Sequence, residues 1–173
     1  MTLEINQARK TFAKSKLAPA LIAALMLSVI GTTPSYAAAT QADVDYSQSM
    51  IELTGKLQTA SENFSKVGAK PPTWAIGKSY NSWKTKALKS SDTFLSAINA
   101  VAAVKGTDGF ATSHPLLTKA LANFKTGVTL AKAAMNKNDS KKMAKANAAL
   151  LKGNSAWVAW SAAYEADVAA LNG

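Results

Sequence analysis

Apolar residues recur along the chain in four long segments, at alternating steps of three and four residues. In the first segment, at about residues 42–67, this spacing places every apolar residue on one face of an α-helix. Glycine often ends a helix and proline cannot continue one, so Gly68 and the prolines at 71 and 72 predict where this helix stops. The apolar face of the 42–67 helix consists of Tyr46, Met50, Leu53, Leu57, Ala60, Phe64 and Val67.

The second and third segments follow the same rule. A helix is predicted from about Lys78 to Val104, and the turn sequence GTDG at 106–109 ends it. A third helix is predicted to begin near Ser113, which we expect to cap it, with Pro115 in the first turn, where proline is tolerated. The second helix turns Tyr80, Trp83, Ala87, Phe94, Ile98 and Val101 inward, with Leu88 and Leu95 beside them, and the third turns in Leu117, Leu121, Phe124, Val128, Ala131 and Met135.

The fourth segment begins after the sequence NKND, with Asp139 or Ser140 as the expected cap, and runs to about Leu171. Its face consists of Met143, Ala146, Leu150, Gly153, Trp157, Trp160, Tyr164, Val168 and Leu171. Because the three aromatic residues keep the spacing of their aliphatic neighbours, we interpret them as core residues and not as a ligand-binding box. Gly153 is expected to leave room for a ring from a neighbouring helix.

No segment alternates polar and apolar residues with a period of two, so the sequence predicts an all-α domain. The connections between the helices have about ten, about ten and about three residues, which favours an up-down-up-down antiparallel four-helix bundle. This topology brings the ends of the first and third helices, and the starts of the second and fourth, to one pole of the molecule.

The first 37 residues differ from the rest of the chain. Residues 1–16 are basic, residues 17–30 are uncharged and apolar, and small residues follow at Ser35 and Ala37. The apolar run is shorter than the roughly 20 residues with which a helix spans a bilayer. This order predicts a secretory signal peptide at 1–37, cleaved after Ala37. We therefore expect a bundle domain at 38–173 that is secreted or periplasmic and has no transmembrane segment.

The sequence contains no cysteine, so neither disulfides nor thiolate metal sites stabilise the fold and packing must do so. The whole chain has 20 Lys plus Arg and 10 Asp plus Glu. The first 37 residues hold four of the basic residues and one acid, which leaves 16 lysines, nine acids and no arginine in the expected mature domain. The domain is therefore basic through lysine alone.

The predicted topology collects these lysines at one pole. The first corner contributes Lys66, Lys70, Lys78, Lys84 and Lys86, and the second contributes Lys132, Lys137, Lys141, Lys142 and Lys145. The opposite pole holds Asp43, Asp45, Asp108, Glu165 and Asp167. Three of the lysines, at 78, 141 and 142, fall in first helical turns, where the helix dipole disfavours a cation. Trp74 lies on the loop of the first corner, and no helix face accounts for it.

An exposed tryptophan among lysines suits an anionic or sugar-containing partner, through stacking and charge. The candidate binding residues are Lys70, Trp74, Lys78, Lys84, Lys86, Lys137, Lys141, Lys142 and Lys145. We expect an exported, non-enzymatic binding module for an anionic polymer such as a polysaccharide, a membrane surface or an acidic protein. We do not expect nucleic acid, because bidentate contacts to phosphate and guanine are made by arginine. In the competing interpretation, Trp74 covers the end of the bundle and the lysines only confer solubility.

Residues that carry most enzyme chemistry are scarce. His114 is the only histidine and the chain has no cysteine, which together exclude ordinary zinc sites, cysteine nucleophiles and histidine-paired serine arrangements unless His114 serves alone. We expect His114 to be a polar group at a helix end, and we expect no enzyme activity, metal or cofactor. Two alternatives stay open: a chaperone-like or inhibitor-like bundle that binds a protein through a helix face, and a carrier with a small molecule or haem inside the bundle.

In length and helix order the mature chain resembles the periplasmic b-type cytochrome bundles. That resemblance implies haem held between a methionine in the first helix and a histidine in the last. Met50 occupies a comparable place in the 42–67 helix, but the last helix carries Trp160 and Tyr164 where the family has its histidine. The axial ligand is missing, so the resemblance concerns the architecture and haem is not expected.

Overall fold

The computed structural model describes residues 39–69 and 78–172, and nearly all of them are helical. These ranges contain four α-helices and no β-strand, so the prediction of an all-α fold is confirmed. The α-helices are α2 (Gln41–Gly68), α3 (Lys78–Ala102), α4 (His114–Lys137) and α5 (Ser140–Asn172), and a short 3-10 helix, η1 (Asp108–Phe110), precedes α4. The predicted signal peptide at 1–37 and the candidate residues Lys70 and Trp74 lie outside the described residues.

Local hydrogen bonds explain where two of the helices begin. The Thr40 hydroxyl accepts a bond of 3.2 Å from the backbone N–H of Asp43, and the Asp43 carboxylate accepts one of 2.9 Å from the backbone N–H of Thr40. This reciprocal capping box starts α2. At the start of α5 the cap is Asp139, whose carboxylate accepts a bond of 2.8 Å from the backbone N–H of Lys142. Of the two expected caps, Asp139 is therefore the one that the structure uses.

Ser113 precedes α4 but does not cap it with its side chain, so this prediction was wrong. A capping side chain normally extends from an extended backbone, whereas Ser113 has helical angles, with φ −81° and ψ −39°. Its buried hydroxyl has no partner among the described residues. The backbone N–H of Ser113 instead donates a bond of 2.9 Å to the carboxylate of Asp167 in α5. Ser113 therefore links the start of α4 to the end of α5.

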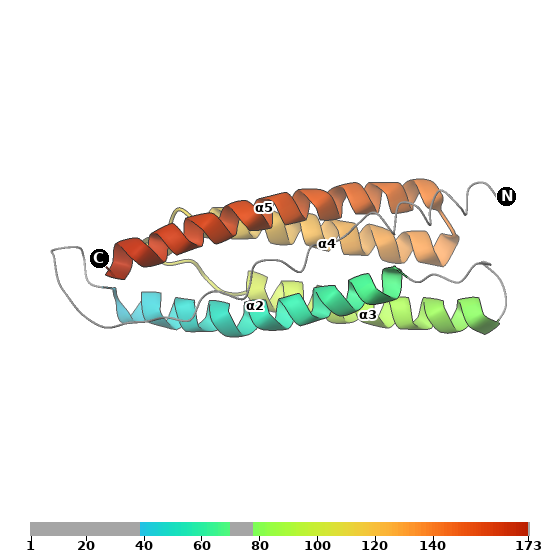
Figure 1. Cartoon of the computed structure of the whole chain (residues 1–173), viewed down its shortest axis with the longest axis horizontal. Helices are drawn as coiled ribbons and strands as arrows, with labels where there is room; N and C mark the ends of the chain where they lie inside the picture. The colour runs from blue at the N-terminus through green and yellow to red at the C-terminus, as the bar shows by residue number, and fades with distance from the viewer. Residues whose placement is uncertain (1–38, 70–77, 173) are drawn as a thin grey trace.

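Contacts between the helices show that successive helices run in opposite directions (Figure 1). Near the start of α3, the indole N–H of Trp83 donates to the carbonyl of Val67, at the end of α2, at 2.9 Å. The Tyr80 hydroxyl, also near the start of α3, donates to the side chain of Asn138, just after α4. The bond from Ser113 to Asp167 joins the start of α4 to the end of α5. These contacts make a helical bundle in which chain direction alternates.

The predicted inward faces form the hydrophobic core, except that Tyr80 lies outside it, because it sits near the start of α3 and its hydroxyl bonds to Asn138. Phe94 in α3 packs against Phe64 of α2 and Phe124 of α4, at ring-centroid distances of 5.6 Å and 6.0 Å. Trp160 and Tyr164 are buried, with exposed fractions of 6% and 3%, which confirms the core interpretation for these two rings. Trp157 is half-buried and packs on Trp160, at 4.4 Å between ring centroids, and on Phe124. Trp157 thus borders the core.

The pairs of neighbouring helices are packed differently. Glycines bring α4 and α5 close together: a Cβ added at Gly127 would lie 2.7 Å from the Leu150 side chain, and one at Gly153 would lie 2.5 Å from the Phe124 ring. The prediction that Gly153 makes room for a ring is therefore confirmed. The backbones of α2 and α5 approach each other less than those of the other neighbouring pairs. These two helices meet through large rings, because Tyr46 of α2 and Tyr164 of α5 both pack on Phe110, at 4.5 Å and 5.1 Å.

Candidate functional site: a lysine-rich pole

The two corners that supply the candidate lysines lie together. The ammonium group of Lys84, near the start of α3, is 3.5 Å from the backbone carbonyl of Asn136, near the end of α4. Tyr80, one turn earlier in α3, donates its hydroxyl proton to the Asn138 side chain. Figure 1 shows the start of α3 and the turn between α4 and α5 at the same end of the bundle. The juxtaposition on which the predicted site depends is therefore present, and we call this end the lysine pole.

Four of the candidate lysines are exposed at the lysine pole: Lys86, Lys137, Lys141 and Lys145. Within the part of the chain that the structure describes, none of these four ammonium groups forms a salt bridge. Lys84 is half-buried, and its contact with the Asn136 carbonyl satisfies one of its donors. Lys78 is the first residue of α3. Unpaired positive charge thus comes from the start of α3, the end of α4 and the start of α5.

Other lysines near this pole are partly neutralised. The Lys142 ammonium group lies 3.8 Å from the carboxylate of Asp139, the residue that caps α5. An acid at a helix N-terminus is favoured by the helix dipole, so Asp139 offsets the unfavourable first-turn position of Lys142. Lys66 lies 3.8 Å from Glu62 within α2. These pairs are exposed or half-exposed, and contribute at most about 1 kcal/mol each.

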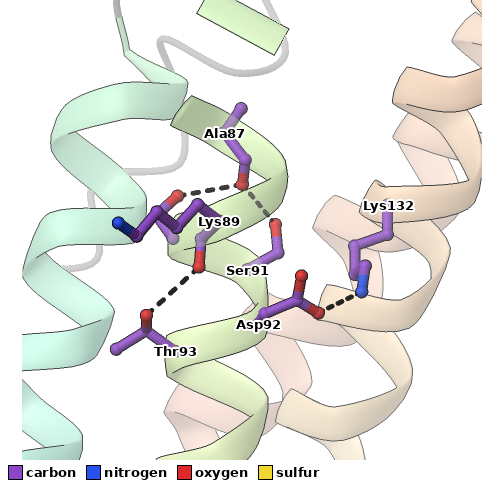
Figure 2. A network of polar contacts seen from close by, with 7 residues as sticks. Ala87, Lys89, Ser91, Asp92, Thr93 and Lys132 are labelled. Atoms are coloured by element: carbon purple, nitrogen blue, oxygen red, sulfur yellow. Dashed lines mark hydrogen bonds and ion pairs between the residues drawn. The ribbon is translucent and has the colours of Figure 1, made fainter. Parts of the chain in front are cut away.

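Figure 2 shows how Lys132 is used between α3 and α4. Its ammonium group donates to the carboxylate of Asp92 in α3, which ties the two helices together just below the lysine pole. One residue earlier, the fully buried Ser91 hydroxyl donates to the carbonyl of Ala87 at 2.7 Å and so has a partner within its own helix. Lys132 is therefore committed to a contact between helices and is not part of the free positive surface.

Acidic residues lie at the opposite end, as predicted, and two of them stabilise the fold. Asp43 is buried against the turn before α4, since a Cβ added at Gly109 would lie 2.5 Å from its carboxylate oxygen. Hydrogen bonding from the Thr107 hydroxyl, and then from Thr40, lowers the pKa of Asp43 to about 2. Neither Thr107 Oγ1 nor Asp43 Oδ1 has a hydrogen-bond partner of normal geometry among the described residues, so the contact between them is less well formed than the bonds that join Asp43 to Thr40. Asp167 holds the Ser113 backbone.

His114 also lies at the acidic end, where its Nδ1 is 3.1 Å from the Tyr46 hydroxyl. This contact fits the prediction of a polar group at a helix end. Burial, followed by the nearby Tyr164 and Asp167, raises the pKa of Tyr46 to about 12. The described residues contain no group of three or more histidine, cysteine or acidic side chains placed to hold a metal ion. None of the described helices is apolar over enough of its length to cross a membrane.

Several structural residues were missed by the sequence analysis. Phe110 is fully buried, but it lies in a connection, outside any helical repeat that could have revealed it. Asn138 ends α4 in the left-handed conformation, with φ 51° and ψ 42°, and the asparagine-rich turn sequence was the available signal for this. Asn147 is buried at 4% exposure, and neither of its side-chain polar atoms has a partner among the described residues.

No protein-family model, curated protein or solved structure matches the chain. The function must therefore be argued from the residues and their arrangement.

Proposed function

We propose that the protein is an exported, non-enzymatic binding module that uses its lysine pole to bind an anionic surface, an anionic polysaccharide or an acidic protein. The observation that carries the proposal is the contact between the two corners, in which Lys84 meets Asn136 and Tyr80 meets Asn138. Through this contact, lysines that are distant in the sequence share one end of the molecule. Residues 1–37 would direct export, consistent with their basic, apolar and small-residue segments.

The separation of charge supports this mode of binding. Four exposed lysines, Lys86, Lys137, Lys141 and Lys145, gather at one end of the bundle, whereas the other exposed lysines are spread over the molecule. Buried or hydrogen-bonded carboxylates such as those of Asp43 and Asp167 lie at the other end. A molecule with this distribution is oriented by an anionic surface, so that its basic end approaches first. The same field raises the rate of encounter at low ionic strength.

The expected affinity is modest. Each lysine close to an anionic surface contributes about 1 kcal/mol, so the four exposed lysines would contribute about 4 kcal/mol. That free energy corresponds to a dissociation constant of about 1 mM for a single site. Useful retention would therefore depend on a partner with many charges, such as a polymer or a membrane, and would weaken as salt shortens the screening length.

The test compares two triple variants of equal charge change. One reverses Lys86, Lys137 and Lys141 to glutamate at the lysine pole, and the control reverses Lys105, Lys119 and Lys125, which are exposed elsewhere on the molecule. Retention is measured on beads carrying an anionic polymer and on vesicles containing anionic lipid, at 50 mM and 500 mM salt. We expect the first variant to lose retention at 50 mM salt, and the control to keep most of it.

The outcomes separate a local site from a general effect of net charge. Equal losses in the two variants would show that net charge alone drives retention, and would refute a site at the lysine pole. Binding by the unmodified protein that persists at 500 mM salt would contradict a charge-driven mechanism. Circular dichroism of both variants checks that the helices remain formed.

A further inference from the structure

Five aromatic rings form a continuous path from α5, through η1, to α2. Within α5, Trp157 packs on Trp160 at 4.4 Å between ring centroids, and Trp160 packs on Tyr164 at 5.5 Å. Phe110 then joins Tyr164 to Tyr46, at 5.1 Å and 4.5 Å. We call these five residues the aromatic path. Tryptophan and tyrosine are the most easily oxidised aromatic side chains, so contacts of this kind let an electron move between them.

The indole N–H of Trp160 is buried and has no hydrogen-bond partner within the described ranges. A buried donor without a partner is uncommon and calls for an explanation. When an indole ring loses an electron its N–H becomes acidic, and transfer of that proton to water or to a base lowers the oxidising power of the ring. Trp160 has no such acceptor among the described residues. Its oxidised ring would therefore keep the proton and readily take an electron from a neighbouring tyrosine.

The two tyrosines of the aromatic path differ in what can accept the phenol proton. A tyrosine that loses an electron becomes strongly acidic, so it stays oxidised only where a base takes its proton. The polar neighbour of the Tyr164 hydroxyl is the hydroxyl of Ser47, which is a very weak base. The Tyr46 hydroxyl lies 3.1 Å from Nδ1 of His114, which is within the reach of a general base. An oxidising equivalent on the aromatic path should therefore settle on Tyr46.

The surroundings of His114 hold its ring in this accepting position. Tyr46 is buried, with an exposed fraction of 3%, and Nδ1 of His114 is the acceptor that the described residues offer to its hydroxyl proton. A buried hydroxyl proton without an acceptor is costly, so the contact favours the neutral imidazole that carries its proton on Nε2. The ring also lies against Gly106, where an added Cβ would be 2.6 Å from Cγ of His114. Glycine at position 106 therefore leaves the space that the imidazole occupies.

The electrostatics favour a proton that moves to His114 as the electron leaves. Burial, followed by the nearby Tyr164 and Asp167, raises the pKa of Tyr46 to about 12, so the phenol keeps its proton at neutral pH. Oxidation through a preformed phenolate is therefore disfavoured. When the proton crosses to Nδ1, the products are a neutral tyrosyl radical and an imidazolium cation. The Asp167 carboxylate disfavours a negative charge on Tyr46, and it stabilises a positive charge on the imidazole beside it.

We propose that Tyr46 and His114 form a proton-coupled redox pair that is oxidised through the aromatic path. A one-electron oxidant of the radical class takes one electron from Trp157, whose ring is half-buried and therefore reachable from solvent. One electron then moves from Tyr46 along the aromatic path and restores Trp157.

The net reaction is balanced within the pair and the oxidant. The O–H bond of Tyr46 breaks, an N–H bond forms at Nδ1 of His114, and the oxidant is reduced by one electron. A one-electron reductant reverses the step, because the electron returns to Tyr46 and the proton follows it from His114. This inference does not depend on the anionic partner proposed above, since none of these residues belongs to the lysine pole.

Pulse radiolysis with the azide radical, which oxidises tryptophan faster than tyrosine near neutral pH, tests the pair. We expect the tryptophanyl absorbance to decay and the tyrosyl absorbance to grow at one first-order rate that does not depend on protein concentration. Tyr46→Phe keeps the ring without its hydroxyl and is expected to remove most of the tyrosyl product. Tyr80→Phe is the matched control, because Tyr80 contacts Trp83 at 5.7 Å but donates its proton to the Asn138 carboxamide, which is not a base.

Two further measurements test the role of the base. His114→Gln and His114→Phe are expected to slow the growth of the tyrosyl signal at least tenfold, because a positioned base typically contributes about 10²–10⁴-fold to a proton transfer. In the unmodified protein the signal should grow more slowly in heavy water than in ordinary water, and this comparison needs no variant to fold. Circular dichroism checks the helices of each variant.

Three results would each overturn the proposal. The first is a tyrosyl yield in Tyr46→Phe that equals that of the unmodified protein. The second is an unchanged rate in folded His114 variants, or equal rates in heavy and ordinary water. The third is loss of the tyrosyl product in Tyr80→Phe, which would place the radical at the other end of the bundle.

Discussion

Replacing Gly153 by alanine is expected to destabilise the protein, although alanine normally favours a helix. A Cβ at position 153 would lie 2.5 Å from Cδ1 and 2.8 Å from Cε1 of Phe124. These distances are too short for carbon atoms, so the ring or the helix must move. The Phe124 ring has little room to do so, because Phe94 and Trp157 pack against it at centroid distances of 6.0 Å and 6.2 Å.

The expected magnitude follows from two opposing effects. Alanine in place of glycine in a helix stabilises by about 1 kcal/mol, whereas an extra carbon in a packed core costs about 1–3 kcal/mol. Taking about 2 kcal/mol for the overpacking, we expect a net loss of about 1 kcal/mol. Gly55, also within a helix, provides the control, since a Cβ there would meet nothing within 4 Å. Gly55→Ala is therefore expected to stabilise by about 0.4–1 kcal/mol.

Urea unfolding monitored by circular dichroism measures both variants. Repeating Gly153→Ala in a Phe124→Leu background removes the ring edge that causes the clash, and the substitution should then become neutral or stabilising. If Gly153→Ala stabilises the protein as much as Gly55→Ala does, the close packing of α4 on α5 that we describe is wrong. A Gly153→Ala penalty that persists unchanged in the Phe124→Leu background would place the strain elsewhere.

Three further predictions concern the helix ends and the acidic pole. Asp43 has a pKa of about 2 in the folded protein, below its unfolded value, so its contribution to stability is complete above about pH 4 and is lost as the pH falls toward 2. Urea midpoints measured from pH 5 to pH 2 should therefore fall less steeply for Asp43→Asn than for the unmodified protein. Equal slopes in the two proteins would contradict a lowered pKa of Asp43. The pKa of Tyr46 is raised to about 12 in the folded protein, above its unfolded value, so its contribution to the stability of the fold is complete below about pH 10 and is lost as the pH rises to about 12. In a pH titration followed by tyrosine absorbance, Tyr46→Phe should remove the ionisation that occurs at the highest pH. Asp139→Ala removes the α5 cap and should cost about 1 kcal/mol in urea unfolding, whereas a variant with unchanged stability would show that the bond to Lys142 contributes nothing.

The helices themselves were predictable because their pattern is local. The spacing of three and four residues reflects the 3.6-residue turn of the backbone, which does not depend on neighbouring helices. It correctly placed Trp160 and Tyr164 in the core and identified Gly153 as the contact for a ring. The half-buried Trp157 shows the limit of this reasoning, since spacing assigns a residue to a face but does not fix how much of it is covered.

The lysine pole was predictable in part for the same reason. Short connections reverse the chain, so the order of the helices already implied that Lys84 and Lys137 share one end. The sequence did not show which lysines are free. Whether Lys132 reaches Asp92 depends on the relative rotation and height of α3 and α4, and these are set by packing between the helices.

The sequence by itself determined the four helices, their inward faces and the separation of basic from acidic residues, because each of these follows from spacing along one continuous chain. Only the tertiary structure decided that Phe110 fills the end of the core between Tyr46 and Tyr164, and that α4 and α5 pack closely while α2 and α5 remain further apart. Those features arise from the fit of side chains that are distant in sequence, and a local repeat carries no record of that fit. The same fit leaves Leu151 and Val158 on an uncovered face.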